Sequence, residues 1–377
     1  MRLAILGTRG IPASYGGFET FAEQVAVRLA ERGHQVTVYC VFDDTKQPES
    51  FKGIKLTYLS SPRLGPLTTI IFDLRCLWHA RNRYDVVYML GYGAGIFCFI
   101  PRMWGTKVWI NMDGIEWARA KWGRIAKTYF KIMEFIAMRT ASRIIADADG
   151  ISHFLYSRHP VATPCSVIPY GAPVVELAPS TAFLDERGLQ KDAYYLVVCR
   201  LEPENHIRDI LSGFIASASK SPLVLIGDYT MRTDYVRQLR DVHNDRIRFL
   251  GTVYNPDNLQ SLRYYCKAYF HGHSVGGTNP SLLEALGCGN IVIAHDNVFN
   301  REVAAEAGIY FRAAEDIPGL VREVESVDGR RRSQWADRAR KRIINYYNWD
   351  AVTKKYFDLL QSDSTAPGAQ GVPEQER

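Results

Sequence analysis

The segment 276–287 combines small residues, a helix cap and a carboxylate. Asn279 can cap a helix and Pro280 suits its first turn, so backbone N–H groups around Thr278 would point at an anion. Glu284 lies about one turn inside this helix, where its carboxylate could accept hydrogen bonds from ribose hydroxyl groups. These residues indicate a nucleotide phosphate site, with a plain helix carrying a surface glutamate as the alternative.

A second glycine-rich loop, residues 7–17, follows the first apolar run of the chain. Gly16 and Gly17 close it, directly before a helical pattern that starts at Glu19. Small residues let backbone N–H groups approach a phosphate, and the helix start adds positive potential. Because the spacing matches neither the dinucleotide nor the Walker pattern, a tight structural turn is an equal alternative.

Two further loops place charged groups directly after predicted strands. Arg200 follows the strand 194–198, and its guanidinium could bind a diphosphate through paired hydrogen bonds. The alternative is a structural ion pair with a neighbouring glutamate, such as Glu202. Asp113 follows the strand 107–110, where its carboxylate could orient an acceptor hydroxyl, take its proton, or simply cap the loop.

The elements that must position these loops alternate between strand and helix in two series, which predicts an α/β fold. We expect two facing doubly wound, Rossmann-like domains, residues 1–170 and 171–361, with the active site in the interdomain cleft beyond the strand ends. A helix near 350–361 is a candidate to pack back on the first domain. Residues 362–377 are rich in Ser, Pro, Gly and Gln and predict a disordered tail.

Charge and composition narrow the function classes. Residues 1–170 carry 21 Lys and Arg against 13 Asp and Glu, a net charge of +8, whereas the whole chain of 377 residues carries +6. A one-sided basic surface suggests an anionic partner. The chain shows no apolar stretch long enough to span a bilayer and no signal peptide, which favours the cytoplasm. Seven scattered cysteines indicate reduced thiols.

The segment 117–140 predicts a basic amphipathic helix. At 100° per residue its basic side chains share one arc: Lys121, Arg124, Lys127 and Lys131. Such a helix can lie on an anionic membrane, although the solvated face of a core helix has the same pattern. We expect membrane contact through these residues and Trp122, with the apolar side packed inward. A nucleic-acid partner is not expected, because no stacking platform or recognition helix is evident.

Taken in order, these motifs resemble a GT-B glycosyltransferase of family 4, the retaining nucleotide-sugar class. Within that class the chain is similar to bacterial transferases that add rhamnose, or a related sugar, to a lipid-linked precursor of surface polysaccharide. The resemblance covers about residues 1–350 and rests on these segments: 7–12, 16–19, 111–117, 121–122, 200–205 and 272–285.

The resemblance implies a role for each candidate residue. The C-terminal half would hold the nucleotide sugar, with Glu284 on the ribose. The diphosphate would contact the following residues: Gly16, Gly17, Arg200, Asn205, His206, Thr278 and Asn279. Asp113 would lie beside the acceptor hydroxyl, and Arg200 would stabilise charge on the leaving diphosphate. No cofactor is expected beyond the donor. Asp147 and Asp149 form an Asp-x-Asp pair, but helix capping explains them better, so no metal is expected.

Two positions depart from the family pattern. Position 276 is glycine where the family usually has a glutamate, and His206 stands where it usually has a lysine. The expected activity is metal-independent transfer to a polyprenyl-diphosphate-linked saccharide at the inner face of the cytoplasmic membrane, with rhamnose from a dTDP donor as one candidate. A nucleotide-sugar epimerase and a non-catalytic sugar-nucleotide-binding protein are the alternatives.

Overall fold

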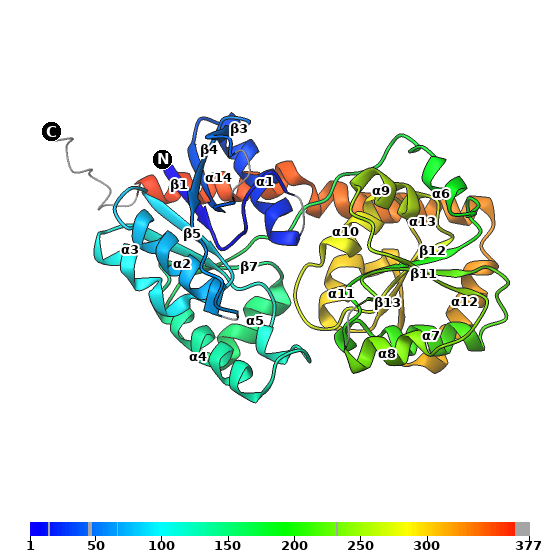
Figure 1. Ribbon diagram of the computed structural model, residues 1–377. Coiled ribbons are helices and arrows are strands. Elements are labelled where there is room, and N and C mark those ends of the chain that lie inside the picture. Colours follow the sequence, from blue (N-terminus) through cyan, green and yellow to red (C-terminus); the bar gives the residue numbers. More distant parts are fainter. Residues whose placement is uncertain (14–15, 44–46, 66, 231–232, 366–377) are drawn as a thin grey trace.

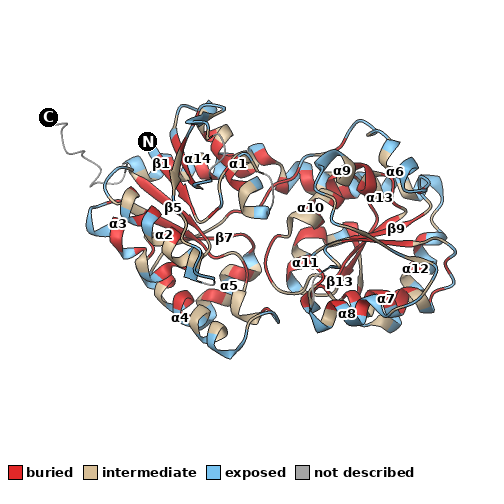
Figure 2. Cartoon of the chain, viewed as in Figure 1, coloured by how far each residue is buried: buried red, intermediate tan, exposed pale blue. Residues whose placement is uncertain are grey.

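The structure is a computed structural model that describes residues 1–13, 16–43, 47–65, 67–230 and 233–365 (Figure 1). Within these residues the chain forms two α/β domains, each built on its own sheet. Figure 2 shows that the central strands of both sheets are buried, with exposed surface on the outer faces of the helices. Strands buried on both faces read as continuous apolar runs, as Val86–Leu90 illustrates.

The described part of the first domain holds an eight-stranded sheet in the order β3-β4-β2-β1-β5-β6-β7-β8. Its strands are β1 Arg2–Leu6, β2 Gln35–Val41, β3 Ser50–Phe51, β4 Ile54–Leu59, β5 Val86–Leu90, β6 Lys107–Asn111, β7 Arg143–Ala146 and β8 Cys165–Val167. Its helices are α1 Gly17–Glu31, α2 Leu67–Ala80, η1 Gly95–Phe97, α3 Phe99–Met103, η2 Glu116–Ala118, α4 Arg124–Thr140 and α5 Asp149–Arg158. All pairings are parallel except β3 with β4.

The described part of the second domain holds a six-stranded parallel sheet in the order β11-β10-β9-β12-β13-β14. Its strands are β9 Tyr195–Val198, β10 Leu223–Ile226, β11 Ile247–Gly251, β12 Ala268–His271, β13 Val292–His295 and β14 Gly308–Phe311. Its α-helices are α6 Ala182–Glu186, α7 Ile207–Ala216, α8 Asp234–Arg240, α9 Pro256–Tyr264, α10 Pro280–Gly287, α11 Val298–Ala304, α12 Ile317–Glu325 and α13 Gly329–Arg342. Short turns of helix are η3 Pro203–Asn205, η4 Ala305–Ala307, η5 Ala314–Asp316 and η6 Ile343–Tyr347.

The last described helix, α14 Trp349–Thr365, returns to the first domain, where it lies beside α1 (Figure 1). The hydroxyl groups of Tyr356 and Tyr88 share a hydrogen bond of 2.8 Å inside the core. Near the end of the helix, the Asp363 carboxylate accepts a 3.0 Å hydrogen bond from the Trp109 indole. The prediction of a disordered tail from residue 362 is therefore wrong for 362–365, which are helical because these contacts anchor them. Residues 366–377 lie outside the described part.

The basic helix is shorter than predicted. Residues 116–118 form the separate turn η2, and α4 starts only at Arg124, after Gly123. Lys121 and Trp122 therefore precede the helix rather than share its face. The Trp117 indole donates a 2.8 Å hydrogen bond to Glu134 of α4, which turns this part of the chain back along the helix.

Candidate active site

The strand ends of the two sheets meet at a pair of glycines. Gly114 follows β6 and Gly276 follows β12, and a Cβ built on Gly114 would lie 2.8 Å from the Gly276 Cα. Both residues have positive φ, at 64° and 127°. A side chain at 276 would be strained at this φ, which accounts for the glycine there, whereas the close contact with Gly276 leaves no room for a side chain at 114.

Hydrogen bonds to different parts of the chain fix the position of Asp113. Its N–H donates to Asn111 at 2.8 Å, and its carboxylate accepts from the Tyr170 hydroxyl at 3.3 Å. Asn111 in turn donates to the Tyr88 hydroxyl at 3.1 Å, and Tyr88 meets Tyr356 of α14. Burial raises the pKa of Asp113, and nearby positive charge opposes that increase. The structure thus offers a preoriented carboxyl group with strengthened affinity for a proton.

Arg119 is a buried cation beside Asp113 that sequence reasoning missed. Its side chain is almost completely buried, and its Nε lies 2.7 Å from a Glu116 carboxylate oxygen. Burial lowers the pKa of Arg119, but Glu116 and Asp113 outweigh burial, so the net shift is upward. Glu202 and Glu204 of the second domain add to this effect. The sequence shows the positive charge of Arg119, but its acidic partners surround it only after the chain has folded.

Arg200 follows β9, as predicted, and remains free to contact a ligand. Its side chain is about half exposed, and its Nη2 lies 3.5 Å from a Glu202 carboxylate oxygen. The Asn205 amide donates a 2.7 Å hydrogen bond to the Arg200 carbonyl, which fixes the loop. The ion pair that was the alternative interpretation therefore exists, but its separation is long and its arginine is half exposed, and such pairs contribute little stability.

Three histidines lie close to the loop that follows Arg200. His206, in a left-handed conformation at the start of α7, contacts Asp209 through Nδ1 at 2.9 Å and Ser274 through Nε2 at 3.1 Å. Its ring stacks on His295, with ring centroids 4.0 Å apart. His273 contacts the Asn205 side chain at 2.9 Å, and burial lowers the pKa of His273 to about 3, so it stays neutral near pH 7.

The start of α10 has the predicted cap. The Asn279 side chain accepts from the Ser281 N–H at 2.9 Å, and Pro280 begins the helix. Glu284 pairs with the buried Arg263 at 2.7 Å, which sequence reasoning also missed, and its own side chain stays 39% exposed. Its carboxylate is therefore oriented while remaining accessible.

The glycine-rich loop of the first domain reaches the same helix. A Cβ built on Gly17 would lie 3.6 Å from the Pro280 ring, so this glycine packs against the start of α10. Gly16 has a φ of 107° and precedes α1, and a side chain there would collide with the Glu19 carboxylate. The two glycine-rich segments of the sequence thus come together across the domains.

Asp147 and Asp149 do not cap their own helix, which corrects the interpretation from sequence. The N-cap residue of α5 is Ala148, and its side chain makes no capping hydrogen bond to the helix. Instead, Glu302 of the second domain accepts the N–H groups of Asp149 at 2.7 Å and Gly150 at 3.0 Å. Among the described residues, no group of three or more His, Cys, Asp or Glu side chains is arranged to hold a metal ion.

The predicted membrane residues divide into two groups. Arg124, Lys127 and Lys131 lie on α4, whereas Lys121 lies in the preceding loop with its ammonium 4.9 Å from the Trp122 ring centre. Partial burial and the charge of Arg200 lower the pKa of Lys121, and the nearby Glu116 opposes this shift. No helix in the described ranges is long and apolar enough to cross a bilayer.

The apolar side of α4 does not pack fully inward, contrary to expectation. Ile125 is 88% exposed, and Ile132 and Phe135 are about half exposed. These residues are spaced by seven and three, so they form one stripe along the helix. Apolar and basic side chains therefore share the outer surface of this helix.

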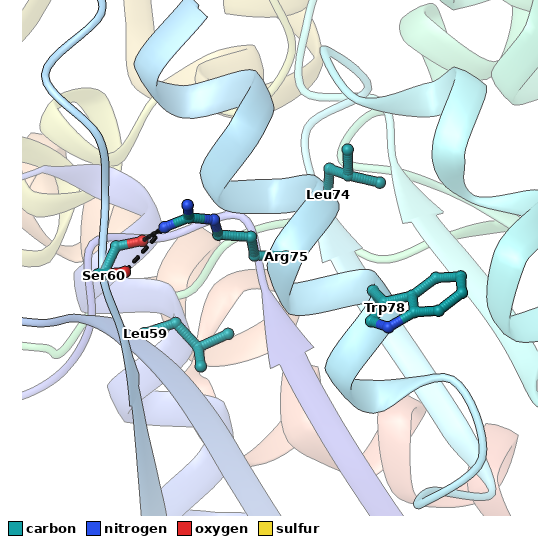
Figure 3. Close-up of a pocket in the computed structure, with 5 residues that line it drawn as sticks. All are labelled: Leu59, Ser60, Leu74, Arg75 and Trp78. Carbon is teal, nitrogen blue, oxygen red and sulfur yellow. Dashed lines mark hydrogen bonds between the residues drawn. The ribbon is translucent and has the colours of Figure 1, made fainter.

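A separate hollow of about 520 Å³ lies between β4 and α2, away from the predicted site residues. Figure 3 shows its lining of Leu59, Ser60, Leu74, Arg75 and Trp78. The Arg75 guanidinium donates to the Ser60 carbonyl and hydroxyl, both at 2.8 Å, which closes one side of the hollow.

Comparisons with known families support this architecture. Residues 182–342 match a family described as glycosyl transferases group 1, and residues 1–173 match a domain of unknown function, DUF1972. No curated protein sequence matches the chain. The second domain is thus a glycosyl transferases group 1 domain, and the chain is a glycosyltransferase.

Similar solved structures cover nearly the whole chain. Sucrose-phosphate synthase from Thermosynechococcus elongatus has 16% identity and a TM-score of 0.80, over 96% of this chain and 98% of its own. HepE from Anabaena, in complex with UDP-glucose, has 18% identity and a TM-score of 0.76, over 96% and 100%. A glycosyltransferase from Rickettsia africae has 14% identity and a TM-score of 0.75, over 97% and 98%. The predicted GT-B fold is confirmed.

Proposed function

We propose that this glycosyltransferase transfers a sugar, with retention, from a nucleotide-diphosphate donor to a lipid-linked saccharide at the inner face of the cytoplasmic membrane. Rhamnose from a dTDP donor is a candidate, and a polyprenyl diphosphate is the proposed lipid carrier. The observation that carries the proposal is the contact between the start of α10 and Gly17 of the facing domain, with the positive charge of Arg200 acting on Asp113. Glu284 lies on the same helix α10, oriented by Arg263.

The donor assignment is supported by the chemistry of the second domain. A half-exposed arginine and a capped helix start both attract a diphosphate, and Glu284, oriented by Arg263, suits ribose hydroxyl groups. Asn205 fixes the Arg200 loop, and His206 lies next to it. The similar protein HepE binds UDP-glucose and UDP, which makes a nucleotide sugar the natural donor class for this fold.

The proposed reaction exchanges one bond at the anomeric carbon for another. The bond from that carbon to the donor phosphate oxygen breaks, the acceptor oxygen forms a new bond on the same face, and the acceptor proton passes to the departing diphosphate. Arg200 stabilises the developing negative charge. Asp113 orients the acceptor hydroxyl, since burial raises its pKa and a carboxyl group with that character can share a proton.

Membrane association is supported by the outer surface of the first domain. The exposed stripe Ile125, Ile132 and Phe135 on α4 lies beside Arg124 and Lys131. Apolar side chains flanked by basic groups suit the boundary of an anionic bilayer.

A second exposed apolar region lies on α2 and α3 of the same domain. Trp78 and Trp104 are about half exposed and pack edge to face with centroids 6.1 Å apart, and the Arg81 guanidinium lies over both rings. Tryptophan and arginine together favour the interface between lipid and water. Both regions therefore support a peripheral position on a membrane.

The proposal is tested by measuring hydrolysis and transfer across a panel of nucleotide sugars, with EDTA present and with a short-chain polyprenyl-diphosphate saccharide as acceptor. We expect transfer from one donor, insensitive to EDTA, that is lost in Glu284→Ala. Conversion of a nucleotide sugar without any acceptor would instead support the epimerase alternative. Nucleotide binding without turnover on any donor would support a non-catalytic binding protein.

A further inference from the structure

The two domains exchange hydrogen bonds where β7 ends and α10 begins. The Thr278 N–H donates to the Asp147 carboxylate at 3.0 Å, and the Thr278 hydroxyl donates to the Asp147 carbonyl. Thr278 belongs to the loop 276–279 that leads into the candidate diphosphate site, whereas Asp147 belongs to the other domain. A residue of the first domain thus fixes the backbone of the donor loop in the second.

This contact has an energetic cost. Asp147 is only 1% exposed, and its second carboxylate oxygen has no partner among the described residues. Burial raises the pKa of Asp147 well above its usual range, and the nearby Asp113 raises it further. The cost of this half-satisfied carboxyl group offsets part of what its hydrogen bond with Thr278 contributes, so the closed contact is only modestly favoured over a state in which Asp147 returns to water.

The residues around Asp147 fit closely against its carboxyl group and the loop that follows it. A Cβ at Gly277 would overlap the Asp147 carboxylate, so the close approach requires glycine there. Glu302 accepts two N–H groups immediately after Asp147, at Asp149 and Gly150. Contacts in both directions across the domains therefore converge on this single loop.

We propose that Asp147 is a positioning residue that holds the 276–279 loop in its donor-competent form only when the two domains are closed. This inference rests on the proposed function, since it assigns the loop to the donor diphosphate. In the open state Asp147 returns to water and Thr278 loses its anchor. Closure therefore completes the donor site, and the first domain contributes to donor positioning without touching the donor.

Kinetics and binding of Asp147→Ala test this role. We expect kcat to fall about tenfold, the effect of losing roughly 1.4 kcal/mol in the transition state, while the Kd of the free nucleotide changes less than about threefold. Asp147→Asn keeps a carbonyl oxygen for the Thr278 N–H, so it should recover most of the activity. The matched control is Asp149→Asn, which removes an exposed acid two positions away and should behave as wild type.

A double-mutant cycle tests the contact itself. Gly277→Ala should lower kcat strongly in the wild-type background, because its Cβ overlaps the carboxylate. The same substitution should cost little more in Asp147→Ala, where the colliding atoms are gone. Strictly additive effects would contradict the proposed closed contact.

Small-angle X-ray scattering of the nucleotide-free full chain supplies a readout that needs no turnover. We expect Asp147→Ala to have a larger radius of gyration than wild type and Asp149→Asn. Wild-type protein without transfer activity would overturn the proposed function, whereas an Asp147→Ala variant as compact as wild type would overturn the positioning role. Equal losses of kcat in the alanine and asparagine variants would also contradict it.

Discussion

Arg200 and Arg263 show how the same side chain serves two purposes in one site. Arg263 is buried and holds Glu284 at 2.7 Å, so it orients a binding group. Arg200 is about half exposed with a loose 3.5 Å partner, so it can turn to a ligand at little cost. The exposed arginine is therefore the one whose loss should affect catalysis without affecting the fold.

We expect Arg200→Ala to lower kcat/KM by about 10²-fold, the usual effect of removing one group that stabilises transition-state charge. The melting temperature should stay within about 1 °C of wild type, since exposed ion pairs contribute little stability. Transfer assays and thermal unfolding on the same preparation measure both. Arg208→Ala, an exposed arginine of α7, is the control. Unchanged turnover in folded Arg200→Ala would contradict the role.

Asp73 of α2 gives a pH-dependent prediction. It is 4% exposed, one carboxylate oxygen has no partner among the described residues, and burial raises its pKa to about 8. Because the folded state holds the proton more tightly than the unfolded state, this group favours folding at low pH. That contribution is lost as pH rises from about 4 toward 8, by up to about 1.4 kcal/mol per unit.

Asp73→Asn should therefore be more stable than wild type at pH 8, and the difference should shrink toward pH 4. Urea unfolding at several pH values measures it. The exposed acid Asp149 provides the control, since Asp149→Asn should show no such trend. A difference that does not vary with pH would show that the carboxyl group of Asp73 is solvated or paired.

Sequence reasoning located the residues that follow strands, but not the partners that fix them. As the sequence predicted, Arg200 and Asp113 follow strands and Asn279 caps a helix. Arg119 and Arg263 were missed because their acidic partners are adjacent only after folding. Local spacing identifies a binding group, whereas the groups that orient it are set by the fold.

Among the elements, α4 departs most from its sequence pattern. Periodicity alone extends the helix to residue 117, but α4 begins only after Gly123, and Glu116–Ala118 form the separate turn η2. The sequence pattern also predicted that the apolar side of this helix packs inward, yet Ile125 and Ile132 are exposed. A wide apolar arc cannot reveal which part of it a neighbouring element covers.

We expect the combined variant Arg124→Gln, Lys127→Gln and Lys131→Gln to bind anionic liposomes more weakly, by about 1 kcal/mol for each charge removed. Binding of soluble nucleotide should not change. The control replaces three exposed arginines of the other domain with glutamine: Arg330, Arg331 and Arg338. Liposome sedimentation at low and physiological salt measures the effect. If both triple variants lose binding equally, net charge rather than α4 governs association.

At the scale of the molecule, the two strand series predicted both sheets, while the contacts between the domains had no signal in the sequence. The pairing of Gly114 with Gly276 and of Asp147 with Thr278 joins residues more than a hundred positions apart. No periodic pattern encodes such a contact. The return of α14 was a candidate from sequence, but its anchoring through Tyr356 and Asp363 was not.

Leu360→Ala tests the contribution of α14. Leu360 is fully buried, so the substitution should lower the free energy of unfolding by about 2–4 kcal/mol. Denaturant unfolding followed by tryptophan fluorescence measures this. Lys355→Ala on the exposed side of α14 should cost less than about 0.5 kcal/mol. Similar stability of both variants would mean that α14 contributes little to the first domain.

The position of α14 also sets an order of events during protein synthesis. The second domain is translated between the first domain and the helix that covers Tyr88 and Trp109. At ordinary elongation rates the interval between them is on the order of 10–40 s. The first domain is thus completed only after the second has been made, and a nascent chain with an uncovered aromatic core is a natural client for chaperones.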